Sequence, residues 1–295
     1  MARKILITNP NAQSGRSWKA CEELVRGRSD IQILDITKAT VDSVIQQAIG
    51  EGVDTILAAG GDGTISSVAH AIITSGHDLR LGILPTGTFN HFAKDLGIPL
   101  DLVAALSVID AGHTAHVDTG RVNDLSFINN SSIGLYPAMV QARQKLERTG
   151  ISKWFAFIHV VSDTSLHRRS LSIRLGSDPD CPTKKTAGIF IGNNRYKLEG
   201  TSFGTRESLD EGTLFVALMR KISIAGAMRL IVKTMMGTMH ADSDIDIVGL
   251  KRCVITSHHK WLLVAHDGEV SRLQTPLCYS TQPHSLKVIV PRTIQ

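Results

Sequence analysis

The chain has 295 residues, of which 42% are hydrophobic and 20% are charged. This length allows one large domain or two, and this composition excludes wholesale disorder. The formal net charge of +5 suits an anionic small molecule, a nucleic acid or an anionic membrane surface. Because aromatic residues make up only 5% and no basic run is interleaved with them, we do not expect a nucleic-acid-binding protein.

The sequence predicts neither a membrane span nor a targeting segment. It has no uncharged apolar run of the length that a transmembrane helix needs. The apolar run Ile5–Ile7 near the N-terminus is too short for a signal peptide. The four cysteines are far apart without a CxxC pair, which argues against a zinc site or a disulfide framework. We therefore expect a cytoplasmic protein with reduced cysteines.

In the first part of the chain, short apolar runs alternate with helical patterns. We expect strands at Lys4–Thr8, Ile31–Ile36, Thr55–Ala59 and Arg80–Leu84. We expect helices at Trp18–Gly27, Val41–Glu51, Ile65–Ser75 and Leu102–Ala111. Strands separated by helix-length segments predict a parallel sheet covered by helices, in which ligands bind at the carboxyl ends of the strands.

After about residue 115 the pattern changes to short alternating segments. Expected strands are Leu171–Leu175, Ala187–Gly192, Leu214–Met219, Lys251–Ser257, Trp261–Ala265 and Leu286–Val290, and helical patterns occur at Tyr136–Arg148, Lys153–His167 and Ala225–Met236. Short strands without crossover helices predict an antiparallel sheet or sandwich. We therefore predict an α/β domain over residues 1–118 and a β-rich domain over residues 119–295, whose last residues can return to the first domain.

The third expected strand ends in Gly60-Gly61-Asp62-Gly63-Thr64, and a helix follows. Glycines let a phosphate chain approach the backbone closely, and the N–H groups and dipole at the start of a helix favour its charge. Asp62 fits either as a helix cap or as a carboxylate near a magnesium–phosphate complex, and Thr64 can donate a hydroxyl hydrogen bond. A tight strand–helix turn without a ligand is the alternative interpretation. The run is neither a Walker A loop nor a Rossmann glycine motif.

Two further loops favour the ligand interpretation. TNPNAQSGR (8–16) follows the first expected strand, and LPTGTFNHFA (84–93) follows the fourth. Because parallel strands end at the same edge of a sheet, we expect all three loops to converge on one nucleotide-phosphate site. The candidate phosphate contacts in these two loops are Asn9, Ser14, Gly15, Arg16, Thr88 and Asn90.

The motifs NPNAQSG (9–15), GGDGT (60–64) and PTGTFNHFA (85–93) resemble, in this order and spacing, the catalytic domain of the diacylglycerol kinase family. The likeness is strongest to its bacterial soluble lipid kinases, in the superfamily of sphingosine, ceramide and NAD kinases. It covers nearly the whole chain, because INNSSIGLYP (128–137), IGNNRY (191–196), LDEGTL (209–214) and HDGEV (266–270) fall where the family carries its C-terminal motifs. GGDGT alone is shared across the superfamily, whereas its combination with GTxN and a late DGE is much more specific.

The resemblance implies a three-layer α/β domain followed by a β-sandwich-like domain, the fold of NAD and diacylglycerol kinases, with ATP in the cleft between them. It implies transfer of the γ-phosphoryl group of MgATP to the hydroxyl of a lipid such as diacylglycerol. The general base would be Glu269, with Asp267 beside it. The implied nucleotide-binding residues are Asn9, Ser14, Gly15, Thr37, Gly60, Gly61, Asp62, Gly63, Thr64, Ser66, Ser67, Thr88 and Asn90.

The same resemblance implies an acidic metal–water network at the phosphates, with Asp62 and Asp118 as members. Two departures bear on the metal. His91 stands where many relatives have an Asp, so either it contacts phosphate or acceptor directly or the magnesium arrangement is altered. Glu211, preceded by Asp210, stands where relatives use an Asp for a second, structural magnesium, which leaves that site open.

Without the resemblance, two interpretations of Glu269 are open. It follows an expected strand in a turn with Gly268, where a carboxylate can orient the acceptor hydroxyl and take its proton. Alternatively, Asp267-Gly268 is only a hairpin turn and Glu269 is a solvated strand residue.

Two other functions remain open. The first is an NAD-kinase-like enzyme with a soluble acceptor, against which the late HDGEV motif speaks. The second is a nucleotide- or lipid-binding protein without turnover, which His91 keeps open. A lipid acceptor implies transient contact with a membrane surface, and the basic, Met-rich helical pattern at 221–239 could face either lipid or the core. A homodimer through exposed strands of the second domain is a further possibility.

Overall fold

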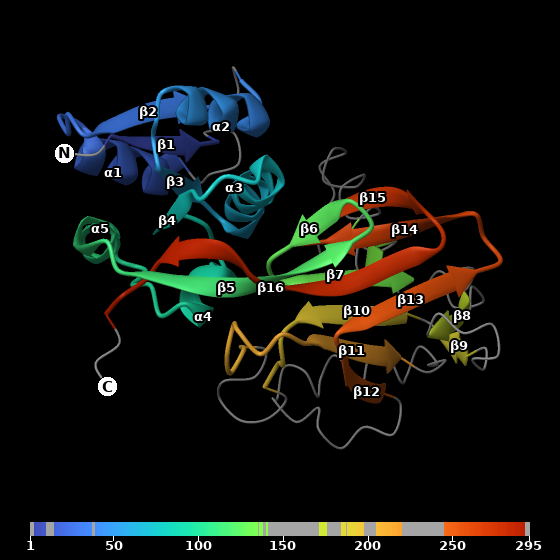
Figure 1. Cartoon of the computed structure of the whole chain (residues 1–295). Helices are drawn as coiled ribbons and strands as arrows, with labels where there is room; N and C mark the ends of the chain where they lie inside the picture. The colour runs from blue at the N-terminus through green and yellow to red at the C-terminus, as the bar shows by residue number, and fades with distance from the viewer. Residues whose placement is uncertain are drawn as a thin grey trace. The chain divides into compact units, whose positions relative to one another are not determined.

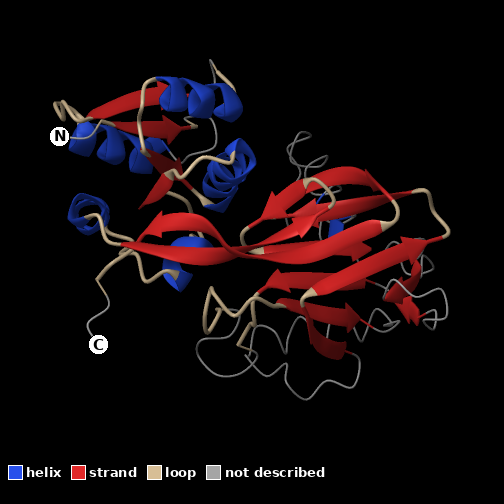
Figure 2. Ribbon diagram, in the orientation of Figure 1, coloured by secondary structure: helices blue, strands red, loops and turns tan. Residues whose placement is uncertain are grey.

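The computed structural model describes residues 3–9, 15–36, 39–134, 136–137, 140, 171–175, 184–186, 188–197, 205–219 and 245–292. The chain divides into two compact units. Unit 1 comprises Met1–Thr119, Ser208–Asp210 and Gln282–Gln295, and unit 2 comprises Gly120–Glu207 and Glu211–Thr281. The path of the chain through both units is drawn in Figure 1, and Figure 2 distinguishes helices from strands.

Unit 1 is built on a parallel sheet with the strand order β2-β1-β3-β4. The end of β16 pairs parallel with β4 through Lys287 and Val288. All six residues of β3 are buried, which explains why this strand appears in the sequence as an unbroken apolar run. The elements are β1 (Lys4–Thr8), α1 (Gly15–Val25), β2 (Ile31–Asp35), α2 (Val41–Gly50), β3 (Thr55–Gly60), α3 (Asp62–Ser75), β4 (Arg80–Pro85), α4 (His91–Asp95), α5 (Leu102–Ala111), the first part of β5 (Thr114–Val122) and the last part of β16 (Leu277–Ile289).

The helices of unit 1 lie on both faces of this sheet. Helix α2 packs against α3, and α1 contacts α5. The chain runs from β1 to β2 in one direction and from β2 through β3 to β4 in the other, so right-handed crossovers place α1 opposite α2 and α3. The predicted α/β fold with a mostly parallel sheet is therefore confirmed.

The local signals at the helix ends explain most of the boundaries. Thr40 and Asp101 accept hydrogen bonds from the backbone at the starts of α2 and α5, and Gly76 and Gly112 end α3 and α5 with φ of 68° and 70°. Helix α3 begins at Asp62, three residues before the predicted start. The apolar periodicity begins only at Ile65, because the first turn of α3 is built from small polar residues.

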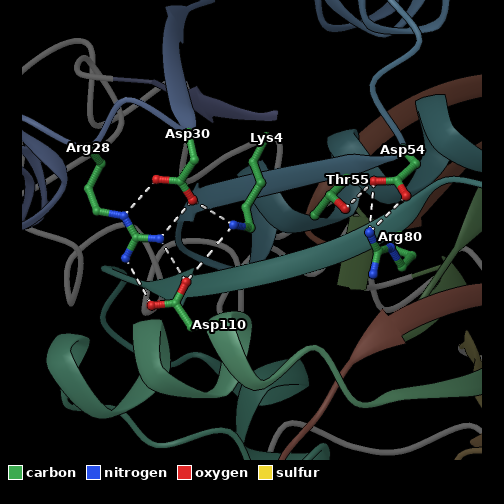
Figure 3. A network of polar contacts seen from close by, with 7 residues as sticks. All are labelled: Lys4, Arg28, Asp30, Asp54, Thr55, Arg80 and Asp110. Atoms are coloured by element: carbon green, nitrogen blue, oxygen red, sulfur yellow. Dashed lines mark hydrogen bonds and ion pairs between the residues drawn. The ribbon is translucent and has the colours of Figure 1, made fainter. Parts of the chain in front are cut away.

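A network of charged side chains lies at the amino edge of the sheet, where the parallel strands begin (Figure 3). The Asp30 carboxylate accepts hydrogen bonds from Lys4 Nζ at 2.7 Å and from Arg28 Nε at 2.8 Å. Arg28 also binds Asp110 near the end of α5, at 2.8 and 2.9 Å. Arg80 donates to both oxygens of Asp54 at 2.8 Å, at the starts of β4 and β3.

Unit 2 is a pair of antiparallel sheets. One has the strand order β12-β11-β10-β7-β14-β15, and the other has the order β16-β13-β8-β9, with β5 pairing β16 and β6. Side chains from both sheets, including Phe127, Ile191, Val216 and Tyr279, form one buried core, as expected for a sandwich. The strands are the end of β5, β6 (Leu125–Phe127), β7 (Asn130–Gly134), β8 (Leu171–Leu175), β9 (Lys184–Thr186), β10 (Gly188–Asn193), β11 (Leu214–Met219), β12 (Ile245–Leu250), β13 (Arg252–Ser257), β14 (Trp261–His266), β15 (Glu269–Gln274) and the start of β16.

The predicted antiparallel character of the second half is confirmed, but several strands were not predicted. Strand β7 has the sequence NSSIG, and its Ser131 and Ser132 are buried, so it carries no apolar alternation. Strand β15 continues directly from a two-residue turn after β14. The helical patterns predicted at 153–167 and 225–236, most of that at 136–148, and the Met-rich pattern at 221–239 lie outside the described residues.

Candidate functional site: the carboxyl edge of the parallel sheet

The strand order of unit 1 reverses between β1 and β3, because β1 is followed in the chain by β2 on one side and β3 lies on the other. In open α/β sheets, ligands bind at such a switch point, outside the carboxyl ends of the strands. The loops that leave β1, β3 and β4 all start at this edge, since the three strands are parallel and adjacent. The edge is therefore the first place to look for a site.

Two glycine-bearing loops touch at this edge. A Cβ atom added to Gly87 would lie 2.2 Å from Gly61 Cα and 3.0 Å from Gly61 N. A Cβ added to Gly60 would lie 2.4 Å from Thr64 Cβ. Only glycine fits at these two positions without backbone or helix movement, so the predicted convergence of the loops after β3 and β4 is confirmed.

Within the described part of the chain, no side chain caps the N-terminus of α3. Its N-cap residue is Gly61, which makes no side-chain hydrogen bond, and the first intrahelical bond runs from Ile65 N to Gly61 O at 3.1 Å. The N–H groups of Asp62, Gly63 and Thr64 precede that bond, so the helix itself offers them no acceptor. A Cβ at Gly63 would meet nothing within 4 Å. This helix start is open and carries the positive end of a 14-residue helix dipole.

Asp62 does not cap its own helix, so that part of the prediction is wrong. Its Oδ1 accepts a hydrogen bond from the backbone N–H of Phe92 at 3.2 Å, in the first turn of α4. The carboxylate therefore ties the loop after β3 to the loop after β4. Its second oxygen has no hydrogen bond to a described residue.

Asn90 has a structural task in the loop after β4. It adopts φ of 52°, and its side chain closes the turn by accepting from Gly87 N at 3.1 Å and donating to Gly87 O at 2.9 Å. Its predicted contact with a nucleotide would compete with these two bonds. Thr86, which we did not predict, is 4% exposed, and its Oγ1 has no hydrogen-bond partner among the described residues. The PTGT run was the only sequence signal for it.

The remaining residues that we predicted to contact the nucleotide differ in their exposure and in their hydrogen bonds. Thr64 is buried against Gly60, whereas Thr88 is exposed. Ser67 uses its hydroxyl on Gly63 O at 2.9 Å, and Ser66 lies half-buried one residue before it. Asn9 directly follows β1 and Gly15 begins α1, while Ser14 and Thr37 lie outside the described residues.

His91, which stands where many relatives have an Asp, is exposed. Its ring stacks on that of the exposed Phe89, with ring centroids 5.7 Å apart and an angle of 10° between the ring planes. The pair lies in the loop that follows Gly87. A neutral or cationic ring thus stands at this edge, where a carboxylate was expected from the resemblance.

The other predicted metal ligands are Asp118 and Glu211. Asp118 is fully buried in β5, and its carboxylate accepts from the backbone N–H of His284 at 2.9 Å. Glu211 is exposed beside Gly212, which has φ of 64°. Within the described ranges, no three His, Cys, Asp or Glu side chains are grouped so that they could hold a metal ion. Asp62 and Asp118 remain predictions as partners of a nucleotide-bound cation.

In unit 2, Asp267 and Gly268 form the two-residue turn between β14 and β15, with φ of 46° and 89°. Glu269 begins β15 and is exposed, with no hydrogen bond or ion pair from its side chain to any described residue. The Asp267 carboxylate, in contrast, accepts three backbone hydrogen bonds, from Ile128, Asn129 and Asn130. The Asp267 oxygens are thus engaged by the backbone, and the predicted catalytic role of Asp267 stays a prediction.

Comparison with known protein families points to the part of the chain that forms this edge. The family model of the diacylglycerol kinase catalytic domain matches residues 3–122. Over these residues the chain is similar to the catalytic domain of the diacylglycerol kinase family. The matched span contains the whole carboxyl edge, from β1 to α4.

Similar proteins extend the likeness beyond that span. The chain is 40% identical over 191 residues to a diacylglycerol kinase from Staphylococcus aureus, covering 64% of this chain and 59% of that protein. It is 46% identical over 134 residues to a Klebsiella pneumoniae protein named "Probable lipid kinase YegS-like", covering 44% of this chain and 45% of that one. The matches thus span about half the length of these relatives. A crystal structure of a diacylglycerol kinase from Bacillus anthracis str. Sterne has the same fold, with a TM-score of 0.71 at 20% identity, covering 100% of this chain and 98% of that chain.

Among the helices that the structure describes, none combines the length with the apolar character that a membrane span requires.

Proposed function

We propose that this protein is an ATP- and magnesium-dependent lipid kinase, which transfers the γ-phosphoryl group of ATP to the hydroxyl of a lipid such as diacylglycerol. The observation that carries the proposal is the open start of α3 at the switch point of the sheet, next to the contact between Gly61 and Gly87. The match to the family model over residues 3–122 and the names of the similar proteins support the reaction class.

The phosphate chain is held by backbone groups in this proposal. The N–H groups of Asp62, Gly63 and Thr64 have no acceptor within α3 and can donate to phosphate oxygens. The open space at Gly63 allows the phosphates to approach closely. Thr86 Oγ1, buried without a partner among the described residues, can add a hydroxyl at the same edge. Such preset donors supply charge stabilisation, which is most of what phosphoryl transfer asks of a protein.

The one predicted carboxylate that the contacts place at this edge, Asp62, fits a magnesium ion. Mg²⁺ prefers oxygen ligands, keeps several waters and needs only one or two carboxylates beside the nucleotide phosphates. Asp62 would hold it through the oxygen that does not bind Phe92 N, and Asp118 is the second predicted carboxylate. When bound, the ion neutralises charge on the phosphates.

Glu269 is the proposed general base. Its carboxylate is exposed, carries no hydrogen bond to a described residue and projects beside a tight turn, so it can accept a proton from an acceptor hydroxyl. The lipid acceptor implies that the enzyme visits a membrane surface from a cytoplasmic location.

The test is phosphoryl transfer from γ-labelled ATP with magnesium to a panel of lipid alcohols in mixed micelles, with NAD as a separate acceptor. Glu269→Gln should lower turnover about 10²- to 10⁴-fold, the range that a general base contributes. Glu207→Gln, at another exposed carboxylate of unit 2, is the matched control and should stay within about twofold of the wild type.

Each outcome decides between functions. A labelled lipid that is lost with Glu269→Gln supports the proposal and names the acceptor. Label on NAD would instead assign a kinase with a soluble acceptor. Tight ATP binding without a labelled product would contradict the proposed turnover.

A further inference from the structure

The segment Ile128–Asn130, just before and at the start of β7, is held by one carboxylate. Asp267 Oδ2 accepts from Ile128 N at 2.8 Å, and Oδ1 accepts from Asn129 N at 2.8 Å and from Asn130 N at 3.1 Å. In return, Asp267 N donates to Asn130 O at 2.9 Å. Four hydrogen bonds therefore join the turn of the β14–β15 hairpin to this tripeptide.

The carbonyl groups of the same tripeptide are held by other side chains. Arg206 Nη1 donates to Ile128 O at 2.6 Å, and its Nη2 donates to Asn129 Oδ1 at 2.9 Å. Asn193 Nδ2 also donates to Ile128 O at 3.1 Å, and Tyr196 Oη donates to Asn129 O at 3.0 Å. Arg206 is only 5% exposed, so these are contacts of a buried guanidinium.

One peptide group connects the two charges. The bond between Ile128 and Asn129 presents its N–H to the Asp267 carboxylate and its C=O to the Arg206 guanidinium. An anion at the N–H end and a cation at the C=O end both stabilise the same orientation of this dipole, and each strengthens the other's hydrogen bond. Loss of either charge should therefore release the tripeptide.

The tripeptide in turn fixes the backbone from which Glu269 projects. His266 pairs with Glu269 across the hairpin and with Ser131 of β7, next to Asn130. The turn residues Asp267 and Gly268 both have positive φ, which the four hydrogen bonds at Asp267 hold in place. The start of β15 therefore has one position relative to β7.

We propose that Arg206 is a positioning residue for Glu269, acting through Ile128–Asn130 and the Asp267 carboxylate. The inference rests on the proposed function, in which Glu269 is the general base. Arg206 touches no reacting group; it sets the direction in which the Glu269 carboxylate projects. Misplacement of a catalytic group by about 1 Å can cost about 100-fold in rate.

The test is a mutant cycle between Arg206→Met and Glu269→Gln, with the best lipid acceptor from the transfer assay. Arg206→Met removes the charge and its hydrogen bonds and should lower kcat about 10- to 100-fold, with the KM for ATP within about twofold. In the Glu269→Gln background the same substitution should lower kcat by less than about twofold more, since residues that act as a unit are not additive. Amide hydrogen exchange at Ile128–Asn130 should become faster in Arg206→Met.

Two further variants sharpen the cycle. Arg272→Met, which removes an exposed arginine from the face of Trp261 in the same unit, is the matched control and should keep kcat within about twofold. If Arg206→Met does not fold, Tyr196→Phe removes only the hydroxyl that donates to Asn129 O, and the same cycle is run with it.

The outcomes separate this inference from the proposed function. Full activity of Glu269→Gln would overturn both the base assignment and the positioning role. Loss of activity in Glu269→Gln with kcat within about twofold of wild type in Arg206→Met would overturn the positioning role alone. An equal fold-loss from Arg206→Met in both backgrounds would also overturn it, because a general loss of folded protein would have that effect.

Discussion

The two edges of the parallel sheet in unit 1 differ in how their polar groups are satisfied. At the amino edge, Asp30 is bound by both Lys4 and Arg28, and its side chain is 7% exposed (Figure 3). At the carboxyl edge, the first N–H groups of α3 have no helical acceptor, and Thr86 Oγ1 has no partner among the described residues. The parallel sheet therefore has paired charges where its strands begin. Where its strands end, it has polar groups without partners among the described residues.

This difference indicates a division of tasks within one sheet. Paired charges and satisfied hydrogen bonds stabilise a fold, whereas preset donors without partners are kept where a ligand will supply the acceptors. Changes at the carboxyl edge should therefore affect ligand binding first, and changes at the amino edge should affect stability alone.

Of the changes at the two edges, the largest effect is expected at the glycine contact of the carboxyl edge. Gly87→Ala would place a Cβ 2.2 Å from Gly61 Cα, so the two loop backbones must separate. We expect kcat/KM for ATP to fall about 100-fold, with a stability loss of about 1–3 kcal/mol. Steady-state kinetics and urea unfolding measure the two effects.

The matched control is Gly50→Ala at the end of α2, where a Cβ meets nothing within 4 Å. It should leave kcat/KM for ATP and the free energy of unfolding nearly unchanged. Wild-type kinetics in Gly87→Ala would mean that the close approach of the two loops is unrelated to nucleotide binding.

At the amino edge we expect a smaller effect, which lowers stability and leaves nucleotide binding unchanged. Asp30→Asn leaves Lys4 and Arg28 without their shared carboxylate and should lower the free energy of unfolding by about 2–3 kcal/mol. The affinity for ATP, measured by calorimetry, should stay within about twofold.

Asp54→Asn serves as the comparison at the same edge. Its carboxylate binds Arg80, but its side chain is 55% exposed, so we expect a loss of less than about 1 kcal/mol. An ATP affinity that falls with Asp30→Asn as much as with Gly87→Ala would contradict the division between the edges.

The smallest effect is expected on mild acidification. Hydrogen bonds from Arg28, and next from Lys4, hold the pKa of Asp30 well below its usual range. Hydrogen bonding to Arg28 also lowers the pKa of Asp110. Because these folded-state pKa values are depressed, the stabilisation is complete at neutral pH and is lost as pH falls below the usual Asp pKa of about 3.9.

The unfolding midpoint in urea should therefore be nearly constant above about pH 5 and decline below it. The free energy of unfolding should fall by less than about 1 kcal/mol at pH 4. Asp30→Asn should show a shallower decline than the wild type. A decline of equal steepness in both proteins would assign the acid sensitivity to other groups.

The sequence predicted the elements of unit 1 well because each has a strong local signal. Strand β1 and helix α5 have the predicted bounds, and GGDGT marks the junction of β3 and α3. The convergence of the loops followed from the parallel arrangement alone. The partners of individual side chains could not be predicted, because Asp62 binds Phe92 N and Asn90 closes its own turn through contacts that depend on the folded loops.

Unit 2 was harder to predict for a related reason. Asp267 belongs to a DG hairpin signal, but its carboxylate binds a tripeptide 137 to 139 residues earlier in the chain. Arg206 had no signal at all, since a buried arginine that binds carbonyl groups looks like any surface arginine in a sequence. Strand β7 has buried serines in place of apolar residues, and the Ser131 hydroxyl donates to Ala265 O.

The most direct test of the central claim is amide hydrogen exchange with and without a non-hydrolysable ATP analogue and magnesium. The account predicts slower exchange at Asp62, Gly63 and Thr64, whose N–H groups gain phosphate acceptors, and no change at Lys4, Ile31 and Thr55 on the opposite edge. Protection at the amino edge, or none at the start of α3 under saturating analogue, would contradict it.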